Sequence, residues 1–216
     1  MFKADLHCHS CVSDGSYQPK ELISIAKERG LQALSITDHD TIGAYDELRD
    51  SALNLGTLTL IPGVELSTTF REEPVHILGY SFDLTSQSLR EFCHYHYKRR
   101  QERFRIMLGK ANKLGLEVSE EEILKEFKKE NSLANLGRPH LAMMMFKKKW
   151  VRSVADAFHK FLGEGQSCYE PSELPSVEET IKQIHQAGGL AVLAHPHLIK
   201  REGVIPALLN MPFDGL

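Results

Sequence analysis

Residues 2–39, FKADLHCHSCVSDGSYQPKELISIAKERGLQALSITDH, contain a strand, a helix and a second strand in direct succession. The runs over 2–9 and 32–36 are typical of short strands. Between them, Pro19 suits the first residue of a helix and Gly30 suits its end. A strand–helix–strand succession predicts that the two strands are parallel neighbours in one sheet.

The same alternation continues beyond this unit. Asp40 or Thr41 can cap a second helix, which we expect to run to about Leu55. Further strands are predicted over 58–64 and 75–80. Helices that alternate with strands in this way indicate a parallel sheet.

The pattern changes in the middle of the chain. Residues 85–162 are predicted to form a run of helices that is interrupted at 137–139. The alternation then resumes with a helix over 177–189, a strand over 190–196 and a further helix to about Leu209. The final FDGL resembles the start of one more strand.

We therefore expect two parts. The predicted fold class is α/β, with a barrel-like body formed by residues 1–84 and 163–216. Residues 85–162 form a helical insertion that we interpret as a cap over the substrate. Since a (β/α) barrel needs all its strands to close, we expect either a smaller open sheet or a body that is incomplete at the C-terminus.

The composition excludes several classes of protein. The 216 residues are 42% hydrophobic and 25% charged, which is ordinary globular usage and not that of a disordered chain. No apolar run is long enough for a transmembrane helix, and the N-terminus becomes polar too early for a signal peptide. Four scattered cysteines suit reduced thiols, so we expect a cytoplasmic protein.

Charge is unevenly distributed along the chain. Residues 85–162 contain 17 Lys and Arg and 9 Asp and Glu, a balance of +8. This leaves 9 of the 26 basic and 20 of the 29 acidic residues for the remainder, a balance of −11. An acidic body suits cations and a basic insertion suits an anionic ligand, although helix faces that are merely solvated would also explain the charges.

Histidines and carboxylates gather near the ends of the predicted strands, where α/β proteins build their sites. His7 and His9 are two residues apart on a strand, so both face the same side. Imidazole and carboxylate groups are ligands for Mn, Zn or Fe, and seven groups exceed the roughly four to six that one ion takes. We therefore predict more than one ion, bound among His7, His9, Asp14, His39, Glu65, His76 and His195.

Other residues of the same types have simpler interpretations. Asp38 is either a turn residue or a group that orients an imidazole, and we interpret Asp40 as a helix N-cap. His94 and His96 lie two apart in a helical stretch and point in nearly opposite directions, as surface or packing residues do. The thiol of Cys8 faces away from the strand histidines.

Five ordered motifs resemble those of the PHP (polymerase and histidinol phosphatase) domain: DLHCHSCVSDGS, ITDHDT, IPGVELS, VHILGY and LAVLAHP. The segments LGRPHLA and KRRQERFRIM are similar to the branch that contains nucleoside 3′,5′-bisphosphate phosphatases and 5′→3′ exoribonucleases. The resemblance covers the whole chain. It implies a distorted (β/α)7 barrel with a site for up to three ions, usually Mn²⁺, with Zn²⁺ or Fe²⁺ as alternatives.

The resemblance also implies roles for single residues. The three ions would be held, in turn, by His7, His9 and Glu65; by Asp14 and His39; and by the bridging Glu65 with His76 and His195. The substrate phosphate would be held by Arg138 and His140, with Arg100 and Arg103 as further candidates. One family motif, a GSDxH-like segment that supplies an Asp and a His, has no counterpart here. We therefore expect reduced activity from these residues alone.

The predicted function is metal-dependent hydrolysis of phosphate from nucleotide 3′,5′-bisphosphates or short RNA 5′ ends. No nucleophilic Ser or Cys motif is present, and neither a membrane nor a stable protein partner is predicted. Three alternatives remain open. They are a histidinol-phosphate phosphatase, an amidohydrolase-type barrel that also begins with HxH, and a metal- or nucleic-acid-binding module without turnover.

Overall fold

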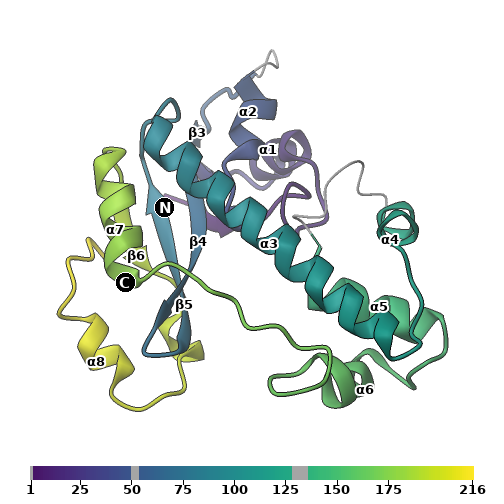
Figure 1. Ribbon diagram of the computed structural model, residues 1–216. Coiled ribbons are helices and arrows are strands. Elements are labelled where there is room, and N and C mark those ends of the chain that lie inside the picture. Colours follow the sequence, from purple (N-terminus) through teal and green to yellow (C-terminus); the bar gives the residue numbers. More distant parts are fainter. Residues whose placement is uncertain (1, 50–53, 128–135) are drawn as a thin grey trace. The chain divides into compact units, whose positions relative to one another are not determined.

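The computed structural model describes residues 2–49, 54–127 and 136–216 (Figure 1). They form two compact units. Met1–Tyr95 with Leu174–Leu216 form the first, which we call the body unit, and His96–Glu173 form the second, the helical unit. The second helix was expected to run to about Leu55. Residues 50–53 lie outside the described part of the chain, and Asn54 and Leu55 are not helical.

The first sheet of the body unit has the predicted parallel arrangement. Its strands β1 (Ala4–Cys8), β2 (Ala33–Ile36) and β3 (Thr59–Leu60) follow one another in that order. Helix α1 (Pro19–Glu28) connects β1 to β2 and starts at the predicted proline. It is followed by Gly30 at φ +68°, a conformation that glycine adopts without strain.

The second sheet is antiparallel, which the sequence pattern did not predict. It contains β4 (Gly63–Phe70), β5 (Glu73–Tyr80) and β6 (Leu190–Leu193), in that order. The prediction of one strand over 58–64 was wrong, because this segment is divided between β3 and β4. Pro62 lies at the division, where a residue without an N–H cannot continue a ladder.

A two-residue turn joins β4 to β5. Arg71 and Glu72 both have positive φ, at 51° and 69°, as a tight hairpin turn requires. Neither residue is the Asn or Gly that usually signals such a turn, so the hairpin has no local signature in the sequence.

Isolated bridges extend this strand arrangement. His39 pairs in parallel with Glu65, and the Asp40 amide donates to the Glu65 carbonyl at 2.8 Å, so the chain after β2 runs beside β4. Gly215 pairs in parallel with Val192 of β6. The predicted C-terminal strand is therefore represented by this single bridge.

Helices cover the strands of the body unit. Helix α7 (Val177–Gln186) contacts β4, β5 and β6 and begins at the cap Ser176, whose hydroxyl accepts from an amide of the first turn (Figure 1). Helix α2 (Gly43–Arg49) contacts α1. A short 3₁₀ turn, Pro196–Leu198, and helix α8 (Val204–Leu208) follow β6.

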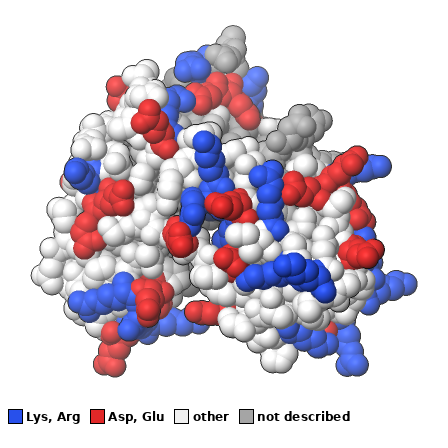
Figure 2. Space-filling model, in the orientation of Figure 1, with Lys and Arg blue, Asp and Glu red and all other residues white. Residues whose placement is uncertain are grey.

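The helical unit has its own apolar core. Its helices are the second half of α3 (Gln87–Lys113), α4 (Glu120–Glu126), α5 (Arg138–Lys147) and α6 (Val154–Ala157), which runs into a π turn at Phe158–Leu162. The buried side chains of this core include Phe104, Met107 and Leu141. Among the described helices, none is both long and apolar enough to cross a membrane. Figure 2 shows Lys and Arg intermixed with Asp and Glu over the visible face.

Candidate metal centre

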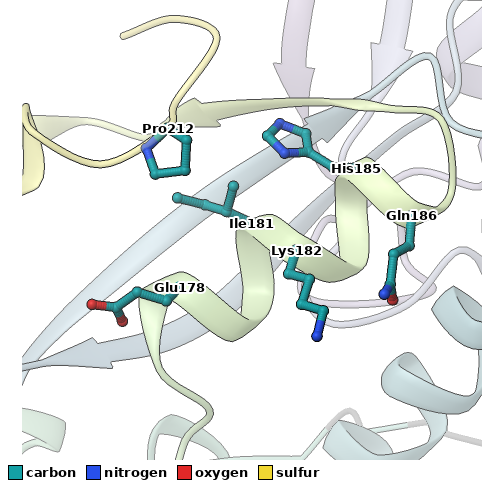
Figure 3. Close-up of a pocket in the computed structure, with 6 residues that line it drawn as sticks. All are labelled: Glu178, Ile181, Lys182, His185, Gln186 and Pro212. Carbon is teal, nitrogen blue, oxygen red and sulfur yellow. The ribbon is translucent and has the colours of Figure 1, made fainter.

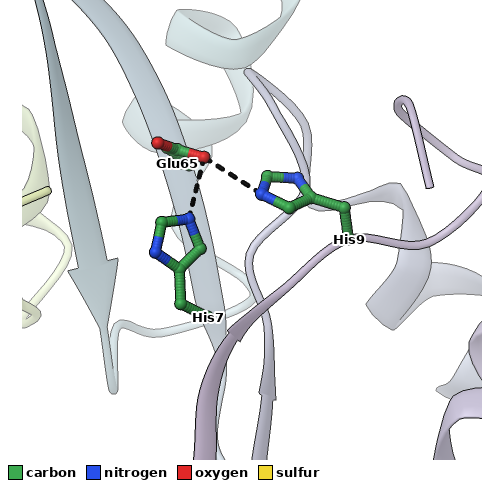
Figure 4. A group of neighbouring side chains, drawn as sticks. All are labelled: His7, His9 and Glu65. Atoms are coloured by element: carbon green, nitrogen blue, oxygen red, sulfur yellow. Dashed lines mark hydrogen bonds and ion pairs between the residues drawn. The ribbon is translucent and has the colours of Figure 1, made fainter. Parts of the chain in front are cut away.

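Glu65 of β4 is the centre of the histidine cluster. Its side chain is 1% exposed. One carboxylate oxygen, Oε2, lies 3.1 Å from Nε2 of His7 and 3.1 Å from Nε2 of His9 (Figure 4). The same oxygen is 3.5 Å from Nδ1 of His39. Three imidazoles from two neighbouring strand ends therefore face one oxygen atom.

The second oxygen of Glu65 faces two more histidines. Oε1 lies 3.0 Å from Nδ1 of His76, on β5, and 2.8 Å from Nε2 of His195, which follows β6. The two imidazole nitrogens are 3.4 Å apart. His195 has φ +29°, so a strained backbone holds a residue of the cluster, as is common at functional sites.

Asp14 extends the cluster on the side of the first loop. Its carboxylate lies 3.5 Å from Nδ1 of His9 and 3.7 Å from Nε2 of His39. The loop folds tightly against β1: a Cβ atom at Gly15 would lie 2.1 Å from the His9 carbonyl oxygen, so only glycine fits there. The structure thus gathers all seven predicted ligands in one place.

The spacing of these atoms fits metal ligands. With ligand bonds of about 2.0–2.2 Å, neighbouring ligands of one ion lie about 3.0–3.5 Å apart, as most of these atom pairs do. Three sets of residues have ligand atoms that converge in this way: His7, His9 and Glu65; His9, Asp14 and His39; and His39, Glu65 and His76. The third set differs from the implied one in taking His39, although His195 also contacts Glu65.

Two buried nitrogens support the same conclusion. Nδ1 of His9 and Nδ1 of His39 are buried without a hydrogen-bond partner among the described residues. A buried polar atom normally has a partner, and an imidazole nitrogen that lacks one is available to a cation. The donor set of imidazoles and carboxylates therefore fits divalent transition metals.

The cluster strongly affects the acidity of its members. Burial would raise the pKa of Glu65, but hydrogen bonds from His76 and His9 and the charge of His39 outweigh it and hold the pKa far below its usual range. Burial lowers the pKa of His39. At His9, burial acts in the same direction, but Glu65 and Asp14 outweigh it and raise the pKa. Glu65 is therefore ionised, as a ligand must be.

Two aspartates hold the backbone around the cluster. We expected that Asp38 could orient an imidazole, but its two oxygens accept from the amide and hydroxyl of Ser10 and from the hydroxyl of Ser13, at 2.6–2.7 Å. Asp38 therefore fixes the loop that carries Asp14. The serines carry no sequence signal for this role, because their partner lies 25 and 28 residues away.

The interpretation of Asp40 as an N-cap was wrong. Helix α2 begins three residues later, and the Gly43 amide donates to the hydroxyl of Thr41. Asp40, at φ +58°, instead accepts from the amide of Ser67 at 2.7 Å and from its hydroxyl at 3.0 Å. This bond holds β4, and with it Glu65, against the end of β2.

Other predicted features are placed as follows. Burial raises the pKa of Cys8 to about 12, its thiol donates to the Ser35 carbonyl, and it belongs to none of the three sets of converging ligand atoms. His94 is exposed and His96 is buried on α3, as their opposite directions predicted.

A separate hollow of about 390 Å³ on α7 contains His185 but none of the seven ligand candidates (Figure 3).

The four predicted phosphate-binding residues all lie in the helical unit. Arg100 and Arg103 are one turn apart on α3, and Arg138 is the first residue of α5. Nδ1 of His140 accepts from the Gly137 amide at 3.1 Å, so the proton of the neutral ring is on Nε2. That nitrogen therefore carries the donor hydrogen of the ring.

Comparison with known protein families identifies the family of this chain. The model of the PHP domain matches residues 5–173. The chain belongs to the PHP domain family. Six of the seven clustered histidine and carboxylate residues lie within this match, and His195 lies beyond it. The expected α/β fold of PHP type is confirmed by solved structures that resemble it throughout.

Several relatives of this chain are named after an enzymatic activity. The chain is 36% identical to the 5′-3′ exoribonuclease Rnm of Salmonella typhimurium, over 89% of this chain and 64% of the relative. It is 30% identical to a 3′,5′-nucleoside bisphosphate phosphatase of Chromobacterium violaceum, over 91% of this chain and 67% of the relative. The chain therefore spans about two thirds of the length of these relatives.

Solved structures also resemble the fold of this chain. A protein from Bifidobacterium adolescentis, solved as a candidate metal-dependent phosphoesterase, superposes with a TM-score of 0.81 at 27% identity, over all of this chain and 76% of that one. A Chromobacterium violaceum structure described as an amidohydrolase, with bound sulfate and no metal, gives 0.80 at 28% identity, over 96% and 72%.

Proposed function

We propose that this chain contains the metal-binding body of a phosphoesterase that removes phosphate from nucleotide 3′,5′-bisphosphates or nucleotides from RNA 5′ ends. The observation that carries the proposal is one buried carboxylate, Glu65, whose two oxygens are shared by five imidazoles at ligand spacing. Such a centre suits a small anionic group more than a neutral one, because its cations attract negative charge. The names of the relatives supply the substrate class.

Different residues of the body unit would bind the metal ions and hold the surrounding loops. His7, His9, Asp14, His39, Glu65, His76 and His195 would hold divalent ions, for which we propose Mn²⁺. Such ions would supply positive charge against phosphoryl oxygens and lower the pKa of the attacking water. Glu65 belongs to two of the ligand sets, so it fixes their separation. Asp38 and Asp40 keep the loops in position.

The helical unit would supply substrate recognition. Arg138 offers a planar fork of donors that matches a phosphate, and Nε2 of His140 offers a further donor. The positive balance of residues 85–162 would attract substrates with several negative charges. The four free cysteines suit a reducing compartment, and we propose the cytoplasm.

The test is hydrolysis by the 216-residue chain in Mn²⁺, with EDTA as the blank. We expect release of phosphate from adenosine 3′,5′-bisphosphate, or of nucleotides from a 5′-phosphorylated RNA, at a higher kcat/KM than from histidinol phosphate. Arg138→Ala and His140→Ala should each lower kcat/KM by about 10-fold or more, since a charged hydrogen bond contributes about 1.5–3 kcal/mol.

Arg152→Ala is the matched control, because Arg152 is an exposed arginine of the same unit. It should leave kcat/KM unchanged. A preference for histidinol phosphate would favour that alternative. Metal binding without hydrolysis of any of the three substrates would favour a binding module, and hydrolysis of an amide would favour the amidohydrolase alternative.

A further inference from the structure

Two arginines of the helical unit share one aromatic ring. The guanidinium carbon of Arg103, on α3, lies over the ring of Tyr169 at 5.9 Å from its centre. The guanidinium carbon of Arg138, on α5, lies over the same ring at 5.6 Å and over Phe158 at 6.0 Å. The face of an aromatic ring attracts cations at this distance. Tyr169 thus brings together two cations that are far apart in sequence.

The backbone of Tyr169 is held in place on α3. Its amide donates to the Gln166 carbonyl at 2.9 Å, and its carbonyl accepts from Nζ of Lys110 at 2.5 Å. Lys110 also binds the carboxylate of Glu170 at 2.6 Å. Nε of Arg103 donates to the Glu170 carbonyl at 2.8 Å. These bonds fix the backbone of Tyr169 and Glu170 against α3.

The two arginines form no ion pair with a carboxylate in the described part of the chain. Lys110 pairs with Glu170 and Arg99 pairs with Glu173, but neither Arg103 nor Arg138 has an ion pair among the described residues. Burial and, after it, the positive charge of Arg138 lower the pKa of Arg103, while Tyr169 and Glu170 act in the opposite direction. Two adjacent, half-buried cations are stabilised when an anion binds between them.

We propose that Tyr169 is a positioning residue that holds Arg103 and Arg138 together as one binding site for a multiply charged phosphate group of the substrate. The phosphate identity rests on the proposed function, whereas the site itself is formed by residues of the helical unit alone. Without the ring, repulsion and side-chain entropy would separate the guanidinium groups, and an anion would have to bring them together again.

The experiment measures binding of inorganic pyrophosphate to the full chain by calorimetry in EDTA, so that no divalent ion contributes. Tyr169→Phe keeps the ring and should bind as the wild type does. Tyr169→Leu should bind about 3–30-fold more weakly, the range that corresponds to one or two cation–π contacts. Arg138→Lys keeps the charge but loses the flat guanidinium group, and should weaken binding without any change at Tyr169.

A double-mutant cycle separates positioning from a general effect on folding. Because Tyr169 acts by holding Arg103 and Arg138 together, its ring should matter less once Arg138 is gone. The affinity lost between Arg138→Gln and the double variant Tyr169→Leu with Arg138→Gln should therefore be smaller than the affinity lost between the wild type and Tyr169→Leu. Arg152→Gln removes an exposed charge of the same unit and should bind as the wild type does. Melting temperatures of all variants report on folding.

Wild-type affinity in Tyr169→Leu would overturn the proposal, and so would fully independent effects of the two substitutions. An equal loss in Arg152→Gln would also overturn it, since the binding would then be unspecific attraction. The assay without metal is independent of hydrolysis. If pyrophosphate binds as expected and no phosphoester is cleaved in Mn²⁺, the proposed function fails and the anion site stands. If a phosphoester is cleaved in Mn²⁺ but pyrophosphate does not bind as expected, only the proposal of the anion site is contradicted.

Discussion

Glu65 lies where β4 passes the end of β2, and each of its oxygens faces imidazole nitrogens from a different part of the body unit. Histidines alone would repel one another when protonated. The shared carboxylate offsets that charge, and it joins imidazoles that come from β1, the end of β2, β5 and the end of β6. Substitution of this single residue therefore affects every ligand set that includes it.

We expect Glu65→Gln to lose bound metal. An amide keeps one weakly basic oxygen but replaces the other by an NH₂ group, which cannot ligate, and it removes the negative charge. Loss of a supporting group costs about 10–100-fold in metal affinity, and loss of a direct ligand should cost more. Elemental analysis after dialysis against Mn²⁺ measures the change. Glu72→Gln, at a side chain that is 94% exposed, is the control and should retain the wild-type metal content.

At the scale of elements, Tyr45 of α2 joins β2 to the start of β4. Its buried hydroxyl accepts from the amides of Ile36 and Gly63, at 3.0 and 2.8 Å. It also lies 2.8 Å from the carbonyls of Ile36 and Ile61, to one of which it donates. These bonds satisfy backbone groups at the end of β2 and where the chain passes from β3 to β4.

Tyr45→Phe should lower the free energy of unfolding by about 1–3 kcal/mol, because it leaves buried amides without an acceptor. Urea unfolding followed by circular dichroism measures the change. Tyr17→Phe, at a ring that is 53% exposed, should have no measurable effect. Equal stability of both variants would mean that water replaces the hydroxyl of Tyr45.

A second pair joins α2 to the first half of α3. Arg90 donates to both oxygens of Asp46, at 3.0 and 2.8 Å, and these hydrogen bonds lower the pKa of the Asp46 carboxyl group. A group with a lowered pKa stabilises the folded chain above its unfolded pKa, and this contribution is lost as the pH falls through the folded value.

Asp46→Asn should therefore lower the melting temperature at pH 7, where the partly exposed pair contributes roughly 0.5–1 kcal/mol. The difference from the wild type should shrink as the pH falls below 3.8, the ordinary value for this group. Melting temperatures between pH 2.5 and 7 test this. Glu28→Gln on the exposed side of α1 is the control. A difference that stays constant with pH would contradict the ion-pair explanation.

At the scale of the whole molecule, the residues proposed to bind metal and the residues proposed to bind phosphate lie in different units. All seven metal-ligand candidates lie in the body unit, whereas the arginines around Tyr169 lie in the helical unit. Each unit has its own apolar core. Metal and anion binding are therefore expected to stabilise different parts of the chain.

Hydrogen exchange should show this division directly. Mn²⁺, compared with EDTA, should slow exchange of amides in β4, β5 and the loop that follows β1, because a ligand stabilises the structure that binds it. Pyrophosphate in EDTA should slow exchange around Tyr169 instead. Uniform protection of both units by Mn²⁺ would contradict independent sites.

The sequence by itself determined the parallel pairing of β1 with β2 and the seven ligand candidates. These features depend on local patterns. The two-residue repeat of a strand places His7 and His9 on one side of β1. Histidines and carboxylates at the ends of strands mark the edge where α/β proteins build their sites. Pro19 and Gly30 fixed the limits of α1 in the same way. Each of these signals acts over a few residues, so it can be read without knowledge of the fold.

Only the tertiary structure decided which partner each side chain takes. Asp40 looks like a cap from its neighbours, but it binds Ser67, 27 residues later, because the chain after β2 runs beside β4. Asp38 likewise binds Ser10 and Ser13 across the sheet. Tyr169 meets Arg103 only because α3 packs beside it. These contacts join distant segments, so packing determines them, and local propensity does not.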